Sequence, residues 1–390
     1  LSDEPQTIII EKDILIDCVG KHFGKAFNSL WNFCQKKGNL SVLKFLSKSI
    51  PRADCVLWVH IFSRILYTII KEDVDQIIDT QPVGTSAIIK AIKCGRKLTR
   101  KPLKLEKILT ELPTDKVIHF FQPIKSLSPQ DRLLIKLIST APLLYENQTN
   151  EAFWQTNCGL SEKDICYESF PLRSAFKTHT DKPQINNNIK IAIKVSSSEE
   201  KMLISNTINK GTLNAEIFLD KIDVTIDSTD LVSTILLGSH PAEEATVNYV
   251  KNFIKMTKST RRHLLFVFCN HHSENKNSLL KRIHDLVDEI KDYPTSLNII
   301  PMCFQGDKVI APLYHRSDAT FTRSGGLTSM ELMLVAKGQI WIHSESTGKE
   351  NLSIGMPIWE KGNALYLQNK KGAQFISPET FPELCASYFN

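Results

Sequence analysis

The sequence predicts an α/β fold in which parallel β-strands alternate with helices. Two observations support this prediction. Apolar runs of strand length recur between residues 231 and 343, and helical segments separate them. Strands that alternate with helices in this way form a parallel sheet that helices cover on both faces. We therefore expect such a sheet in the second half of the chain.

The order of elements in this half follows from apolar patterning. The expected strands are residues 231–237, 263–269, 297–303, 319–322 and 339–343. The expected helices are 241–255, which has Pro241 in its first turn, 278–290, whose apolar residues share one face, and 309–314. Ligands of such sheets bind at the carboxyl ends of the strands, so the loops at Gly238, Asn270, Phe304 and Ser324 should converge on one rim.

The first half of the chain is less regular. The expected strands are residues 7–11, 76–79 and 117–121, and the expected helices are 27–46, broken near Gly38, 56–70 and 85–92. Residues 125–182 predict a helical or loop insert with little strand signal. The polar stretch 183–188 predicts a linker. We therefore expect an N-terminal domain over residues 1–185 and a C-terminal domain over residues 186–390.

Composition fits two ordinary domains. A chain of 390 residues can bury two full cores, and its net charge of +6 is spread along the sequence. The Lys-rich stretch 90–107 favours a solvated surface over anionic lipid, and no nucleic-acid partner is expected. The sequence contains no run of about 18 apolar residues, so it predicts no membrane-spanning helix. Nine cysteines without a CxxC pair indicate reduced cytosolic thiols, and no zinc or other metal site is expected.

The most informative segment follows the expected strand 319–322. It contains Gly325 and Gly326, which let backbone N–H groups approach a ligand, at the start of an expected helix. A helix N-terminus attracts anions such as phosphate. Glu331 lies about one turn into that helix, where its carboxylate suits two ribose hydroxyls. The segment therefore predicts a nucleotide site, and the alternative is a Gly-rich turn in which Glu331 caps the helix.

A second polar group lies near the C-terminus. Glu360, Gly362 and Asn363 follow the expected strand 339–343 and precede an expected last helix, 364–369. A carboxylate and an amide in one loop suit sugar hydroxyls, which both donate and accept hydrogen bonds. The alternative is an ordinary polar loop in which Asn363 caps the helix.

Together, the two motifs resemble the donor half of GT-B glycosyltransferases, in particular the group that holds monogalactosyldiacylglycerol synthase and the bacterial peptidoglycan N-acetylglucosaminyltransferase. The resemblance covers residues 231–376. It implies two Rossmann-like domains that face each other across a cleft. It assigns the donor diphosphate to the Ser/Gly loop, the ribose to Glu331, and the donor sugar to Glu360 and Asn363. The implied donor-binding residues are Gly238, Ser239, Asn270, Phe304, Gln305, Arg323, Ser324, Gly325, Gly326, Leu327, Thr328, Glu331, Glu360, Gly362 and Asn363.

The N-terminal half resembles the lipid-galactosyltransferase branch at residues 31–38 and 79–82. That branch opens with a strand, a Gly-rich loop and a histidine, and residues 1–6 contain none of these. We therefore expect an N-terminal domain that lacks, or has diverged in, its first βα unit. His22 is a candidate acceptor-side base because histidine titrates near neutral pH. The resemblance at residues 31–38 favours a histidine without that role, so the catalytic base is not identified.

The resemblance implies a glycosyltransferase that moves a hexose from a nucleoside-diphosphate sugar, either UDP- or GDP-linked, without a metal and with inversion. No permanently bound cofactor is expected. The alternatives are a GT-B-fold sugar-nucleotide epimerase or hydrolase, and a vestigial interaction module that binds nucleotide sugars. The acceptor is a lipid or a protein, and contact with an anionic membrane surface stays open. The expected location is the cytoplasm, at a membrane periphery, or the host cytosol for a secreted effector.

Overall fold

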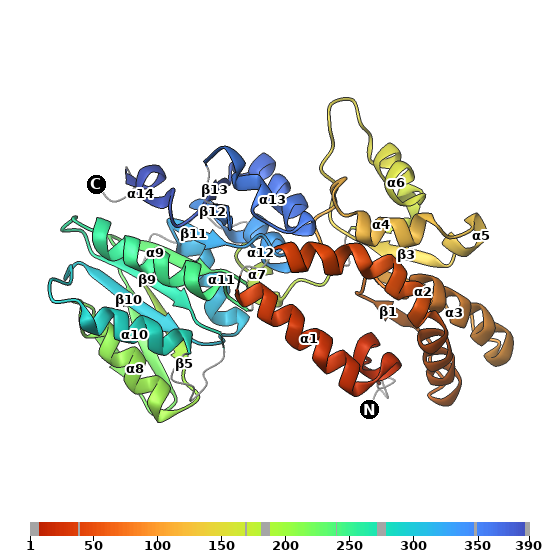
Figure 1. The fold of residues 1–390 in the computed structure, drawn as a ribbon, viewed down its shortest axis with the longest axis horizontal. Coiled ribbons are helices and arrows are strands. Elements are labelled where there is room, and N and C mark those ends of the chain that lie inside the picture. Colours follow the sequence, from red (N-terminus) through yellow and green to blue (C-terminus); the bar gives the residue numbers. More distant parts are fainter. Residues whose placement is uncertain are drawn as a thin grey trace, which may run out of the picture.

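The structure, a computed structural model, describes residues 8–37, 40–167, 170–180, 188–238, 240–270, 278–346 and 349–386. They form two lobes that lie side by side (Figure 1). The N-terminal lobe comprises residues 8–167 of this set, and the C-terminal lobe comprises the remainder. Among the described residues, no helix combines the length and the apolar composition that crossing a bilayer requires.

A parallel sheet of four strands organises the N-terminal lobe, and its strand order follows the chain, β1-β2-β3-β4. These strands are β1 (Ile77–Asp79), β2 (Leu105–Ile108), β3 (Ile135–Ile138) and β4 (Ile165–Cys166). The helices before the sheet are η1 (Ile14–Val19), α1 (Lys21–Lys36) and α2 (Leu40–Lys71). The helices between its strands are α3 (Thr85–Thr99), α4 (Ile118–Lys125), α5 (Pro129–Arg132), α6 (Asn150–Cys158) and η2 (Glu162–Asp164).

A parallel sheet of six strands forms the core of the C-terminal lobe, in the order β10-β9-β8-β11-β12-β13. Its strands are β8 (Leu231–Leu236), β9 (His263–Phe268), β10 (Leu297–Met302), β11 (Ala319–Thr322), β12 (Gln339–His343) and β13 (Gln374–Ile376). Its helices are α9 (Glu243–Met256), α10 (Leu279–Glu289), α11 (Asp307–Arg316), α12 (Gly326–Val335), η3 (Lys349–Ile354), α13 (Ile358–Lys371) and α14 (Phe381–Leu384). Every residue of β9, β10 and β11 is buried, as expected for strands covered on both faces.

Smaller elements complete the C-terminal lobe. The short helix α7 (Ser174–Lys177) packs against α11 and α12, and its Phe176 belongs to the C-terminal core. A separate antiparallel sheet has the order β5-β7-β6 and consists of β5 (Ile189–Lys194), β6 (Ala215–Ile217) and β7 (Lys221–Ile226). Helix α8 (Ser198–Ile208) follows β5 and is capped by Ser197, whose hydroxyl accepts the Glu200 N–H at 3.1 Å.

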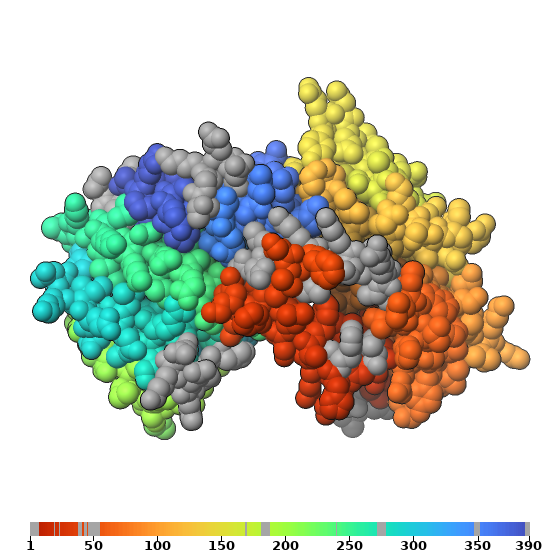
Figure 2. Space-filling model, viewed as in Figure 1, coloured from red at the N-terminus to blue at the C-terminus, as the bar shows by residue number. Residues whose placement is uncertain are grey.

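The two lobes pack directly against each other. An apolar cluster joins Ile108 and Leu112 of the N-terminal lobe to Met330 of α12 and Tyr366 of α13. Helix α1 extends from the N-terminal lobe to the C-terminal lobe (Figure 2), where Lys36 lies 3.5 Å from the Glu243 carboxylate of α9. The interface therefore combines buried apolar contacts with polar ones at its edge.

The expected α/β class and its parallel sheets are confirmed, and all five strands predicted in the second half are present. The helices predicted at 241–255, 278–290 and 309–314 correspond to α9, α10 and α11. In the first half, the strand near 76–79 and the helices at 56–70 and 85–92 are also present. The division between residues 185 and 186 stays a prediction, as does a missing or diverged first βα unit. Residues 183–187 of the predicted linker lie outside the described residues.

Three predictions in the first half were wrong. Residues 118–121 begin helix α4, in which Phe120, Phe121 and Ile124 face the core, because a short apolar run fits a helix as well as a strand. Residues 8–11 form no strand, and Ile8 and Ile9 are exposed. The segment 125–182 contains β3 and β4, which extend the N-terminal sheet. These strands have four and two residues, too few for a clear alternating pattern.

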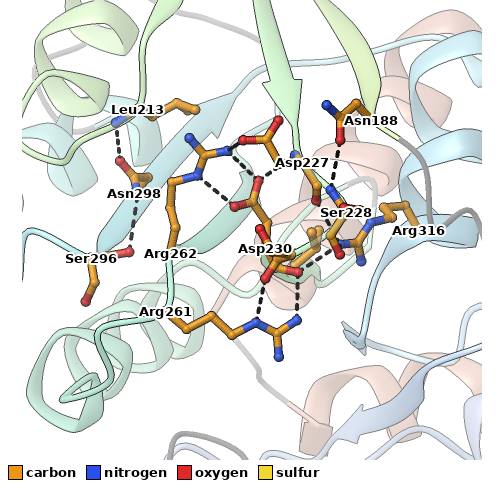
Figure 3. A network of polar contacts seen from close by, with 12 residues as sticks. Asn188, Leu213, Asp227, Ser228, Asp230, Arg261, Arg262, Ser296, Asn298 and Arg316 are labelled. Carbon is orange, nitrogen blue, oxygen red and sulfur yellow. Dashed lines mark hydrogen bonds and ion pairs between the residues drawn. The ribbon is translucent and has the colours of Figure 1, made fainter.

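A network of arginines and aspartates fixes the amino ends of β8 and β9 (Figure 3). Arg262, just before β9, binds both carboxylate oxygens of Asp230 at 2.7 Å and reaches Asp227 at 2.5 Å. Arg316, at the end of α11, donates to the Asp230 carbonyl at 2.8 Å. The network ties the turn between β7 and β8 to the sheet, on the edge opposite the carboxyl ends of the strands.

We expect the Arg262→Met variant to be less stable, because it leaves the buried Asp230 carboxylate without its main counter-charge. Breaking a buried pair from one side costs several kcal/mol, and partial exposure of Arg262 reduces this to about 2–3 kcal/mol. Urea unfolding measures the change. Arg64→Met, on the exposed surface of α2, is the matched control and should stay within about 0.5 kcal/mol of the parent. Equal stability of the two variants would contradict a structural role for the network.

Candidate functional site

Two loops predicted to bind the donor meet where the strand order of the C-terminal sheet reverses. Strand β8 lies between β9 and β11, and Leu236 of β8 is in register with Thr322 of β11. The segments that follow these strands begin at Leu237 and Arg323 and therefore start at the same edge. This is the switch point at which open α/β sheets bind their ligands. Gly238 has φ 91°, a conformation that favours glycine, and Ser239 lies outside the described residues.

Helix α12 starts at this point without a side-chain cap. Gly325 occupies the cap position and its carbonyl accepts the Ser329 N–H at 2.8 Å, while no side chain caps the first turn. The first amides of a helix have no partner within the helix and carry the positive end of its dipole. Leu327 is exposed and Thr328 is half-buried in this turn. The start of α12 is therefore suited to an anionic group.

Glu331 is held by an arginine that the sequence did not indicate. Arg173, just before α7, donates from Nε to Oε1 at 2.7 Å and from Nη2 to Oε2 at 2.8 Å. Glu331 is only 2% exposed, and burial raises the pKa of its carboxyl although Arg173 opposes this shift. The Arg173 guanidinium also lies 4.9 Å from the centre of the Phe176 ring. The bidentate pair fixes the Glu331 carboxylate next to the first turn of α12.

Glu360 and Asn363 lie on a helix, which corrects the prediction that they belong to a loop. Helix α13 begins at Ile358, directly after Pro357, so its first turn includes Glu360. Residues 360–363, which are polar or glycine, interrupt the apolar pattern between Trp359 and Ala364 and so hid the start of the helix. Gly362 lies inside α13, where a Cβ atom would come within 2.6 Å of the Thr114 hydroxyl. The glycine therefore permits close approach of the N-terminal lobe.

Arg323 and Ser324 join the loop before α12 to α13. Arg323 is buried and donates from Nη2 to Glu360 Oε1 at 3.2 Å and from Nη1 to the Gln35 carbonyl at 3.3 Å. The Ser324 hydroxyl donates to the Glu360 carbonyl at 3.0 Å. Burial raises the pKa of the Glu360 carboxyl, and Arg323 opposes that rise. These contacts fix Glu360 and leave Arg323 paired.

Asn363 connects this loop to the N-terminal lobe. Its Oδ1 accepts the Leu112 N–H at 2.8 Å, and its Nδ2 donates to the Ser324 carbonyl at 2.8 Å and to the Glu111 carboxylate. A Cβ atom at Gly326 would overlap the Thr110 carbonyl oxygen and would lie 2.8 Å from Glu111 Oε2. The segment after β2 therefore covers the start of α12. In this structure it closes the position at which the donor diphosphate was expected.

Aromatic side chains close the same boundary next to α1. Trp31 of α1 stacks on Trp359 of α13 with ring centres 5.4 Å apart, and His119 of α4 meets Trp359 edge-on at 6.2 Å. Burial lowers the pKa of His119 to about 4, so its ring is neutral near pH 7. His22 lies at the start of α1, 13 residues before Gln35, which is roughly 20 Å along the helix. The structure therefore does not bring His22 to Arg323.

The remaining predicted residues lie on the neighbouring loops. Gln305 is buried, accepts the Lys194 N–H at 3.0 Å and donates to the Lys194 carbonyl at 2.9 Å, so it ties the loop after β10 to β5. Phe304 is 66% exposed and follows the carboxyl end of β10. Asn270 follows β9 with φ 68° and borders residues outside the described set. The structure thus assigns Gln305 a structural contact and leaves Phe304 accessible.

Sequence analysis missed Glu111 and Arg173. Glu111 follows β2, and a correct prediction of that strand would have placed it at the carboxyl edge of a parallel sheet. Arg173 lies in a segment without a motif. Among the described residues, no three His, Cys, Asp or Glu side chains gather as a metal site requires.

No protein-family model and no curated protein sequence matches the chain. Solved structures that resemble it include MurG from Acinetobacter baumannii, with 12% identity and a TM-score of 0.44 over 86% of this chain and 71% of that one. UDP-GlcNAc 2-epimerase from Neisseria meningitidis, bound to UDP-GlcNAc, has 12% identity and a TM-score of 0.38 over 81% and 73%. A glycosyltransferase from Rickettsia africae has 12% identity and a TM-score of 0.36 over 81% and 72%. Since these TM-scores lie below 0.5, the functional proposal rests on the chain's own residues.

We expect Arg173→Ala to destabilise the protein by about 2–3 kcal/mol at pH 7, because it leaves the Glu331 carboxyl buried without its cation. The change raises the folded-state pKa of Glu331 further above the unfolded value of 4.5. Below that value both states hold the proton, and above it the unfolded state ionises first. The deficit should therefore be smallest near pH 4.5 and grow towards neutral pH.

Urea unfolding at several pH values measures this deficit. The double variant Arg173→Ala with Glu331→Gln is the matched control, because it removes the ionisable carboxyl. Its deficit relative to the parent should not grow with pH. A single-variant deficit that is constant between pH 4.5 and 7.5 would show that Arg173 does not act through the charge of Glu331.

Proposed function

We propose that the chain is a glycosyltransferase that moves a hexose from a nucleoside-diphosphate sugar to an acceptor hydroxyl. The supporting observation is that the uncapped helix α12 starts at the switch point between β8 and β11, with Glu331 on this helix and Glu360 bound to the loop before it. Helix amides suit a diphosphate, and carboxylates suit the hydroxyls of a ribose and a hexose. Phe304 offers a ring for the base.

The chemistry requires stabilisation of a leaving group that gains negative charge. Fixed amide dipoles at the start of α12 and in the loop after β8 would stabilise the departing nucleoside diphosphate without reorganisation. Arg323 would act indirectly, because its charge is compensated by Glu360. We propose inversion at the anomeric carbon, as the sequence resemblance implies.

The ion pair between Arg173 and Glu331 is compatible with a ribose contact. A carboxylate accepts about four hydrogen bonds, and Arg173 uses one site on each Glu331 oxygen. The remaining lone pairs can accept hydrogen bonds from two hydroxyl groups. Arg173 would then keep the carboxylate ionised and oriented when the ribose binds.

A second candidate activity is sugar-nucleotide epimerisation or hydrolysis. This chemistry uses two carboxyl groups. Burial raises the pKa of the Glu111 carboxyl and the negative charge of Glu360 adds to that rise, which makes Glu111 and Glu360 the candidate pair. A vestigial module that binds nucleotide sugars is the third candidate, which the closed site favours. NMR analysis of products separates transfer from epimerisation, and binding without turnover would identify the vestigial module.

The acceptor that we propose is a lipid or a protein. Exposed apolar side chains on α1 and α2, including Phe33 and Val56, favour a lipid at an anionic membrane surface. The nucleotide is proposed to be UDP or GDP. A thermal-shift panel of UDP, GDP and their sugars would identify it, because a ligand that binds only the folded state raises stability.

We expect Glu331→Gln to weaken binding of the nucleoside diphosphate about 10- to 100-fold, since a hydrogen bond to a charged group contributes about 1.5–3 kcal/mol. Isothermal titration calorimetry with UDP and GDP measures the affinity. Glu146→Gln, on an exposed loop of the N-terminal lobe, is the control and should bind like the parent. If Glu331→Gln binds within twofold of the parent, the ribose assignment is wrong.

A further inference from the structure

Glu111 lies on the N-terminal side of the proposed donor site. It follows β2, three residues after Ile108, at the carboxyl edge of the N-terminal sheet. Its Oε2 accepts a hydrogen bond from Asn363 Nδ2 and lies 2.8 Å from the position that a Cβ atom on Gly326 would take. The carboxyl group thus contacts both predicted donor segments, the start of α12 and the first turns of α13, from the opposite lobe.

Other acidic groups near this edge are paired with cations. Asp79, at the end of β1, is buried in an ion pair with Lys107 at 2.5 Å. Asp115 lies 2.5 Å from Lys116 and accepts the Tyr145 hydroxyl at 3.0 Å. For Glu111 the described contacts include the Asn363 amide and no cation. A carboxyl group that is held next to a proposed site without a counter-ion is a candidate for proton transfer.

The surroundings of Glu111 suit a proton acceptor that works near neutral pH. Burial raises the pKa of its carboxyl to about 8, the Asn363 hydrogen bond opposes this rise, and the charge of Glu360 adds to it. Arg323 pairs with Glu360 on α13, and Lys116 pairs with Asp115 on the segment that carries Glu111. A general base is most effective when its pKa lies near the working pH.

From this position we infer that Glu111 is the general base of the proposed transfer. The inference rests on the proposed function. As the acceptor oxygen forms its bond to the anomeric carbon, its proton passes to a Glu111 carboxylate oxygen. The bond between that carbon and the phosphate oxygen breaks, and its electron pair leaves with the nucleoside diphosphate. The proton is then released to solvent.

The geometry favours attack from the side of Glu111. A diphosphate at the start of α12 directs the anomeric carbon away from that helix, and inversion requires the acceptor to approach opposite the leaving group. The segment that carries Glu111 belongs to the lobe that faces α12, so an acceptor held by that lobe would approach the sugar from the side of Glu111. Because Thr110 and Glu111 cover the start of α12, the donor must first enter between the segment and the helix, and closure then returns the carboxylate to the sugar.

Donor hydrolysis, with water as the acceptor, tests the inference without knowledge of the natural acceptor. UDP-glucose, UDP-galactose, UDP-N-acetylglucosamine and GDP-mannose serve as probes, and NMR detects the released nucleoside diphosphate. We expect Glu111→Gln to lower the rate constant about 100-fold or more, the usual contribution of a general base. Nucleotide affinity should change less than threefold. Glu111→Asp should retain part of the rate, and formate should partly restore Glu111→Ala.

Glu146→Gln is the matched control and should hydrolyse the donors like the parent. In the parent, the rate of donor hydrolysis should fall at low pH because Glu111 becomes protonated. In Glu111→Gln this fall should be absent. Retention of the parent rate by Glu111→Gln would overturn the inference and leave the glycosyltransferase proposal intact. Equal losses of affinity and rate, without formate rescue, would assign Glu111 a structural role. If the parent binds and hydrolyses none of the four donors, this result would instead contradict the proposed function itself.

Discussion

The side chain of Asn363 joins the two lobes at the point where the donor is proposed to bind. Its amide is fully buried and contacts the Leu112 N–H, the Glu111 carboxylate and the Ser324 carbonyl. Loss of these partners would leave buried polar groups without hydrogen bonds, and each such group lowers the free energy of unfolding. The loop before α12, helix α13 and the segment after β2 therefore hold each other in place through one residue.

Two glycines make this contact possible. Gly326 and Gly362 lie where a side chain would meet Thr110 and Thr114 of the N-terminal lobe. The sequence motif suggests that Gly326 serves the approach of a phosphate, and the structure shows that it serves the approach of the other lobe. The same surface cannot hold both at once. If the diphosphate binds there as proposed, its binding competes with the contact between the lobes, and Glu111 lies where the two meet.

The sequence predicted what depends on local patterning. Strands β8, β9, β10 and β12 are mostly apolar runs of five or six residues, and the shorter β11 leads into the glycine motif, so these strands and the loops at their carboxyl ends were predicted. Strands β3 and β4 have four and two residues and show no clear pattern, and in α13 the residues 360–363 interrupt the apolar pattern directly after Ile358 and Trp359. Glu111 and Arg173 act on residues 252 and 158 positions away, a distance that no local pattern reports. The Glu111 contact depends on the packing of the two lobes, and the Arg173 contact depends on the packing of α7 against α12.

The most direct test is the hydrogen exchange of the Leu112 amide, followed by NMR, before and after saturation with the nucleoside diphosphate that binds. This amide donates to Asn363 Oδ1 in the closed site. If the diphosphate takes the place of the segment after β2, Leu112 should exchange faster while the first amides of α12 become protected. If the nucleotide binds and Leu112 exchanges at the same rate or more slowly, the start of α12 is not the diphosphate site.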